Sequence, residues 1–61
     1  MNKVPFDGDI IKVENYFISP YFNMKYLYAK VIKATNNGDY WCKVKNGKMF
    51  WFSYRQVLKV M

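Results

Sequence analysis

Short stretches of alternating apolar and polar residues recur along most of this 61-residue chain. A period of two is typical of β-strands that bury one face, because successive side chains point to opposite sides. Turn-favouring residues, chiefly glycine next to asparagine or aspartate, separate the stretches. The pattern predicts an all-β fold with five short strands, at 9–14, 26–34, 40–45, 48–52 and 57–60.

The connections between the predicted strands carry recognisable turn signals. Asn-Gly at 37–38 and again at 46–47 predicts two tight hairpins, since this pair supplies the positive φ angles of a type I′ turn. Asp-Gly at 7–8 predicts a turn before the first strand, and residues 53–56 predict one 3₁₀ turn before the last. A helix over 54–61 is the alternative, but it would be short and would lack an apolar face.

The order of these elements resembles the SH3-like barrel, in the subgroup of small Tudor and KOW-type domains. The segments that carry the resemblance span most of the chain: 8–13, 28–32, 37–44 and 52–60. The resemblance implies one domain over residues 1–61, a five-stranded SH3-like barrel with a long first loop. Domains of this kind bind proline-rich peptides, methylated side chains, DNA, RNA or partner proteins, and the fold alone does not choose among them.

Alternation assigns each strand residue to one side of the predicted sheet. The expected core consists of Ile11, Val13, Leu27, Ala29, Val31, Tyr40, Cys42, Val44, Phe50, Phe52, Leu58 and Val60. The expected outward set is Tyr28, Lys30, Ile32, Trp41, Lys43, Lys45, Met49, Trp51 and Ser53. A one-residue bulge would invert this assignment, burying the tryptophans and exposing Phe50 and Phe52.

The outward set combines large aromatic rings with ammonium groups. Ten Lys and Arg residues stand against four Asp and Glu, a net charge of +6 that favours polyanionic partners. Aromatic faces stack on exposed bases, and interleaved cations neutralise phosphates. The candidate binding residues are therefore Tyr28, Lys30, Trp41, Lys43, Lys45, Lys48, Trp51 and Arg55. The alternatives are that the aromatics only stiffen the sheet through cross-strand pairs, and that the lysines only maintain solubility.

Residues 15–25 have no clear period, and Pro20 argues against a central strand there, so we expect a long loop. It is unusually rich in aromatic residues for a solvated loop. Tyr21 and Phe22 are candidates for docking a partner. Alternatively, the aromatics of this loop cap the open end of a barrel that is too small to bury its own core.

Residue content argues against an enzyme. Histidine is absent, and Cys42 is the only cysteine, so the sequence offers no imidazole base, no internal disulfide and no zinc-ligand set. Asp7 and Asp9 flank Gly8 and are better explained by a turn than by a metal site. We expect no cofactor and no metal. No apolar run is long enough for a membrane span, so a cytoplasmic protein is expected, in the host cytoplasm if a phage encodes it.

Two functions remain open. The leading expectation is a small non-enzymatic module that binds nucleic acid through the aromatic and lysine-bearing sheet face. The alternative is a protein-binding module that recognises an acidic surface, such as a phage-type regulator or inhibitor that docks on a larger host protein. A cage for methylated lysine around Asp39, Tyr40 and Trp41 is a further possibility that needs the rings to converge.

Overall fold

The computed structural model describes residues 4–16 and 24–61. The chain forms five strands and one 3₁₀ turn, in the order β1 (Ile10–Glu14), β2 (Tyr26–Ala34), β3 (Asp39–Val44), β4 (Met49–Ser53), η1 (Tyr54–Gln56) and β5 (Val57–Val60). The all-β prediction is confirmed, and the predicted strand limits differ from the observed ones by one residue at most. The alternative of a C-terminal helix is wrong, because η1 has three residues and β5 follows it directly.

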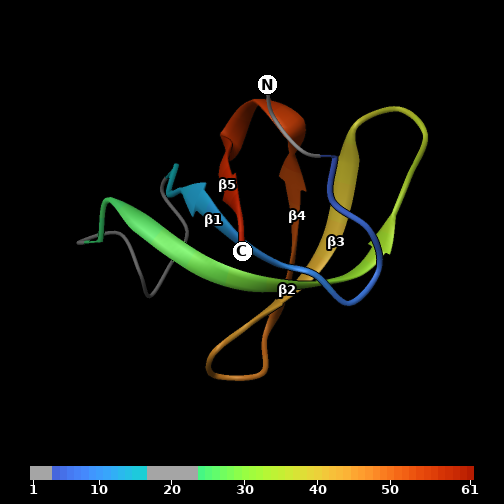
Figure 1. Cartoon of the computed structure of the whole chain (residues 1–61). Coiled ribbons are helices and arrows are strands. Elements are labelled where there is room, and N and C mark those ends of the chain that lie inside the picture. Colours follow the sequence, from blue (N-terminus) through green and yellow to red (C-terminus); the bar gives the residue numbers. More distant parts are fainter. Residues whose placement is uncertain (1–3, 17–23) are drawn as a thin grey trace.

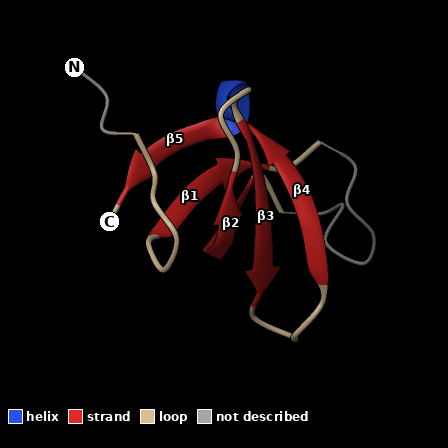
Figure 2. Cartoon of the chain, turned by 90° about the vertical axis from the view of Figure 1, so that its right-hand side faces the viewer, coloured by secondary structure: helices blue, strands red, loops and turns tan. Residues whose placement is uncertain are grey.

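All five strands belong to one antiparallel sheet with the order β4-β3-β2-β1-β5. The long strand β2 lies at its centre and pairs with β1 through its first half and with β3 through its second half. Figures 1 and 2 show how the strands twist and fan out around this central strand. The pairing leaves β4 and β5 as the two edges, so the sheet is open and a closed barrel is not observed.

The core lies on one side of the curved sheet and is built by alternate residues of β1 to β4. Its nine buried members are Ile11, Val13, Leu27, Ala29, Val31, Tyr40, Cys42, Val44 and Phe52. All nine were predicted from alternation. The inverted arrangement, in which a bulge would bury both tryptophans, is therefore wrong.

Leu58 was expected in the core but is 44% exposed. A register irregularity between Lys12 and Val13 explains the difference, because β5 pairs with β1 on either side of it. The inward residues Ile11 and Val13 lie opposite Val60 and Val57, which are three positions apart instead of two. Simple alternation therefore fails on β5: Val57 and Val60 are partly buried against the core, and Leu58 faces outward.

Phe50 was also expected to be fully buried and is only partly so. Its side chain lies on the core side, opposite Cys42 and 6.3 Å from Phe52 between ring centroids. Phe52 lies on the same edge strand and is fully buried, so the edge position alone does not account for the exposure of Phe50.

Both predicted hairpins exist, but their loops have three residues rather than the two of a type I′ turn. In the second, the Val44 N–H donates to the Lys48 carbonyl and the Gly47 N–H to the Val44 carbonyl, both at 2.9 Å. In the first, the Thr35 N–H donates to the Asp39 carbonyl at 3.0 Å. In a hairpin with a three-residue loop, only the last loop residue, here the glycine, adopts a left-handed backbone conformation with positive φ. Gly38 and Gly47 have φ values of 86° and 90°.

Two polar clusters fix the ends of the sheet. The Asp7 carboxylate accepts a hydrogen bond from the Ala34 N–H at 2.8 Å, and the Asp9 carboxylate accepts one from the Phe6 N–H at 2.9 Å. Both aspartates are thus part of a turn, as predicted. At η1, the Gln56 side chain accepts from the Ser53 N–H at 3.0 Å and donates to the Glu14 carbonyl at 3.1 Å, which ties the turn to β1.

Candidate nucleic-acid interface

The side of the sheet that faces away from the core, here called the outer face, carries five lysines together with the exposed rings of Tyr26, Tyr28 and Trp51. Its residues are Ile10, Lys12, Glu14, Tyr26, Tyr28, Lys30, Lys33, Asp39, Trp41, Lys43, Met49, Trp51 and Lys59. Along the strands these residues alternate with the inward ones, and the cross-strand pairs join outer-face residues to one another; Lys33 is placed by its pairing with Trp41. Two carboxylates, Glu14 and Asp39, lie at its margins.

A tryptophan pair occupies one end of the outer face. Trp41 and Trp51 are directly opposite each other on β3 and β4, with ring centroids 5.1 Å apart and planes tilted by 43°. Trp41 is partly buried, whereas Trp51 is 57% exposed. The cross-strand pairing that was considered as a purely structural role thus accounts for part of the Trp41 surface. Most of Trp51 remains open to solvent.

Lysines run across the middle of the outer face. Lys43 lies directly opposite Lys30, and Lys12 lies directly opposite Lys59. Like charges in directly opposed positions destabilise a sheet. Two such pairs, with Lys33 opposite Trp41 beside them, concentrate positive charge on one surface.

Two tyrosines occupy the other end of the outer face. Tyr28 lies opposite Lys12 and is 54% exposed. The neighbouring Tyr26 is also exposed, and the Lys12 ammonium lies 4.7 Å from its ring centroid, within the range of a cation–π contact. The lysines therefore lie between one aromatic pair on β3 and β4 and another on β2.

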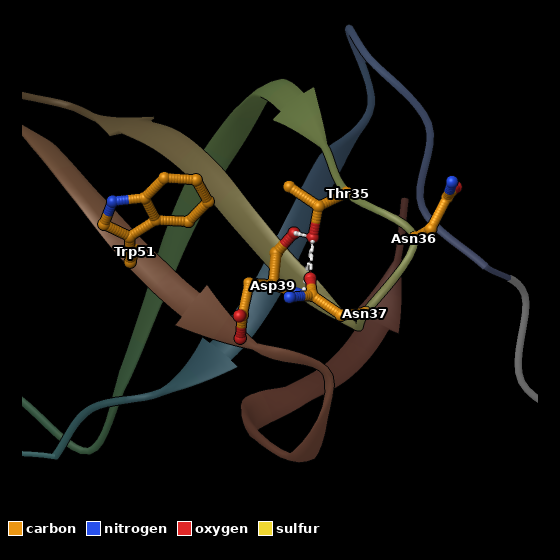
Figure 3. Close-up of a pocket in the computed structure, with 5 residues that line it drawn as sticks. All are labelled: Thr35, Asn36, Asn37, Asp39 and Trp51. Carbon is orange, nitrogen blue, oxygen red and sulfur yellow. Dashed lines mark hydrogen bonds between the residues drawn. The ribbon is translucent and has the colours of Figure 1, made fainter.

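A shallow hollow opens beside Trp51, where β2 passes into β3. Its lining combines the indole with polar side chains of the hairpin loop: Thr35, Asn36, Asn37, Asp39 and Trp51 (Figure 3). The Thr35 hydroxyl lies at the centre of this loop. The hydroxyl is within donating distance of the Asp39 carbonyl oxygen, at 2.8 Å, and of the Asn37 side-chain oxygen. It also accepts a hydrogen bond from the Asp39 N–H at 3.2 Å.

The structure brings some of the predicted site residues together and separates others. Tyr28, Lys30, Trp41, Lys43 and Trp51 share the outer face, as predicted.

The remaining basic candidates lie outside the regular strands. Lys45 and Lys48 are exposed at the β3–β4 loop. Arg55 lies on η1, where its Nε donates to the Tyr54 hydroxyl at 3.4 Å. That contact raises the pKa of the guanidinium. Tyr21 and Phe22 lie outside the described residues, so their proposed docking role stays a prediction.

Sequence reasoning missed three lysines of the outer face. Lys12 and Lys59 could have been found from the alternation of their strands, because each lies next to an inward valine. Lys33 could not. A register irregularity between Val31 and Lys33 shifts the pairing and places Lys33 opposite Trp41 on the outer face. Strict alternation from Val31 would have placed Lys33 in the core.

Cys42 is fully buried in the core, as expected of a small apolar side chain. Burial raises the pKa of its thiol to about 12. At neutral pH the thiol is protonated and is therefore a poor nucleophile.

No family model, curated protein sequence or solved structure matches the chain. Within residues 4–16 and 24–61, no helix is long and apolar enough to cross a membrane. The case for a function therefore depends on the chemistry of the outer face.

Proposed function

We propose that this protein binds single-stranded nucleic acid on the outer face of its sheet. One observation carries the proposal: five lysines share a face with exposed aromatic rings at both ends. The five-strand meander with its 3₁₀ turn also supports an SH3-like architecture, and that assignment is part of the proposal.

The lysine pairs favour a polyanion as the ligand. The repulsion within Lys30–Lys43 and Lys12–Lys59 is relieved when phosphates lie between the ammonium groups. A single carboxylate could neutralise one pair only. A phosphate chain supplies regularly spaced charges across the whole face.

The exposed rings favour a single strand over a duplex. Trp51 and Tyr28 present flat surfaces to solvent, 57% and 54% exposed. In a duplex the base faces are stacked on each other, so such rings find nothing to stack on. The unpaired bases of a single strand are free to stack, which contributes about 1–3 kcal/mol per base.

The identity of the cations argues against the protein-binding alternative. Protein interfaces are enriched in arginine and depleted in lysine. The outer face has five lysines, and the sole arginine of the chain lies on η1. Lysine is well suited to phosphate as a point charge and does not need the fork geometry that arginine offers to carboxylates.

The salt dependence of binding tests the proposal. A fluorescein-labelled single-stranded oligonucleotide of mixed sequence should bind, as followed by anisotropy. Its log affinity should fall linearly with log salt concentration. If all five lysines contact phosphate, the slope is about −3.5, since each contact on a single strand contributes roughly −0.7.

Paired charge variants localise the interaction. Lys30→Ala with Lys43→Ala should weaken binding and make the slope less steep by about 1.4. Lys25→Ala, outside the strand face, should leave the slope nearly unchanged, whereas Lys43→Ala alone should make it less steep by about 0.7. Absence of binding at low salt, or equal slopes for Lys25→Ala and Lys43→Ala, would overturn the proposal. Binding to an acidic protein instead would favour the alternative.

A further inference from the structure

The hollow beside Trp51 lies on the outer face, next to the lysines. Asp39, Trp41 and Lys43 alternate along β3 on that side, and Lys33 lies opposite Trp41. A strand bound along the lysines therefore passes the mouth of the hollow. Figure 3 shows the Trp51 ring to one side and the side chains of the hairpin loop to the other.

The Asp39 carboxylate and the Asn37 amide nitrogen in the hollow are available to bind a ligand, because the hairpin loop is closed by other atoms of these residues. Asp39 closes the hairpin loop with its backbone atoms. Its carbonyl oxygen accepts a hydrogen bond from the Thr35 N–H at 3.0 Å, and its N–H donates to the Thr35 hydroxyl. Its carboxylate has no hydrogen bond or ion pair among residues 4–16 and 24–61. The Asn37 side-chain oxygen is engaged with the Thr35 hydroxyl, which leaves the Asn37 amide nitrogen free to donate. In Figure 3 this nitrogen lies on the side of the Asp39 carboxylate.

We propose that this hollow accepts one guanine base of the bound strand, stacked on Trp51 and read at its edge by Asp39 and Asn37. The inference rests on the function proposed above and adds a base preference to it. Guanine presents two adjacent donors, N1–H and N2–H, which match the two oxygens of one carboxylate. Beside these donors, guanine O6 is an acceptor, and the Asn37 amide nitrogen can donate a hydrogen bond to it.

The other bases match this set of groups less well. Cytosine and adenine each place an unprotonated ring nitrogen next to their amino group, so an acceptor would face the carboxylate. Thymine and uracil flank one N–H with two carbonyl oxygens. The negative charge of Asp39 also repels phosphate, so a base rather than the backbone is expected to enter the hollow.

A single-base substitution series tests the inference with the natural chain. A short thymidine oligonucleotide should bind through the lysines and rings alone. Replacing one central thymidine with deoxyguanosine should tighten binding about tenfold, the order expected of a bidentate contact to a base edge. Deoxyinosine, which lacks the N2 amino group, should lose most of that gain. Deoxycytidine and deoxyadenosine should give little.

Two charge-matched variants separate base reading from general electrostatics. Asp39→Asn should abolish the guanine preference. Glu14→Gln removes a carboxylate from the opposite margin of the outer face and should retain the preference. Both variants should bind the all-thymidine oligonucleotide somewhat more tightly, because each removes one negative charge, and only Asp39→Asn should lose the roughly tenfold gain from deoxyguanosine.

The outcomes distinguish the two proposals. Equal affinity for all the oligonucleotides, or a guanine preference that survives Asp39→Asn, would overturn the pocket while leaving single-strand binding intact. No binding of any oligonucleotide would overturn the function itself, and the pocket with it.

Discussion

Phe50 and Phe52 lie two positions apart on β4 and point to the same side of the sheet, yet only Phe52 is fully buried. Both belong to the edge strand β4 and face the core, but Phe52 lies opposite Tyr40 and Phe50 lies opposite the smaller Cys42. Alternation in the sequence identified the side to which each ring points. The depth of each ring depends on its neighbours in the folded sheet, for which the period of two carries no signal.

The two phenylalanines allow a matched test of the core at the residue scale. Phe52→Ala should cost about 3–5 kcal/mol of unfolding free energy, the range for truncation of a buried aromatic. Phe50→Ala should cost clearly less, since part of its ring is already in contact with water. Urea denaturation of both variants measures the difference. Equal losses would mean that the two rings are equally buried in solution.

At the scale of elements, two register irregularities determine on which side of the sheet Leu58 and Lys33 lie, which the sequence pattern did not predict. One, in the pairing of β1 with β5, moves Leu58 out of the core. The other, within β2, moves Lys33 onto the outer face. Bulges of this kind arise from tertiary pairing and bending of strands, so a period-of-two reading of one strand cannot reveal them. Strand number, turn positions and nine core residues needed only local patterns and were predictable.

The two hairpin glycines provide a matched pair for the element scale. Gly38 and Gly47 have nearly equal positive φ angles, but a Cβ on Gly38 would lie 2.6 Å from the Tyr54 ring, whereas Gly47 has open space. Gly47→Ala should therefore cost about 1–2 kcal/mol, the strain of a left-handed alanine. Gly38→Ala should cost more, because the hairpin and η1 must also separate.

Thermal denaturation of both alanine variants tests this expectation. In the Tyr54→Ala background, the costs of the two glycine changes should become similar. If Gly38→Ala remained the more damaging change there, the Tyr54 contact would not be its cause.

For the molecule as a whole, the proposed function would make the outer face a compromise between stability and binding. Lys43 lies directly opposite Lys30, an unfavourable arrangement in the free protein that the proposed phosphate contacts would offset. Sequence alternation alone found part of this surface, including both tryptophans. The opposed lysine pairs and the hollow beside Trp51 depend on strand register and loop geometry, which only the structure supplies.

That compromise predicts opposite effects of one substitution. Lys43→Gln should raise the unfolding free energy by about 0.2–1 kcal/mol through relief of the like-charge contact. The same change should weaken oligonucleotide binding. Lys25→Gln, outside the strand face, is the control and should alter neither quantity appreciably. A loss of stability in Lys43→Gln would show that the lysine pair is not strained in the free protein.

The central claim, that the outer face is the interface, is tested most directly by titrating ¹⁵N-labelled protein with a single-stranded oligonucleotide and following amide and indole N–H signals. The largest shifts should occur at the Trp51 and Trp41 indoles and at amides of β2 and β3 near Lys30 and Lys43. Signals of the turn at Gly8 should move little. Shifts confined to that turn and η1, or no shifts under conditions that saturate the oligonucleotide, would contradict the assignment.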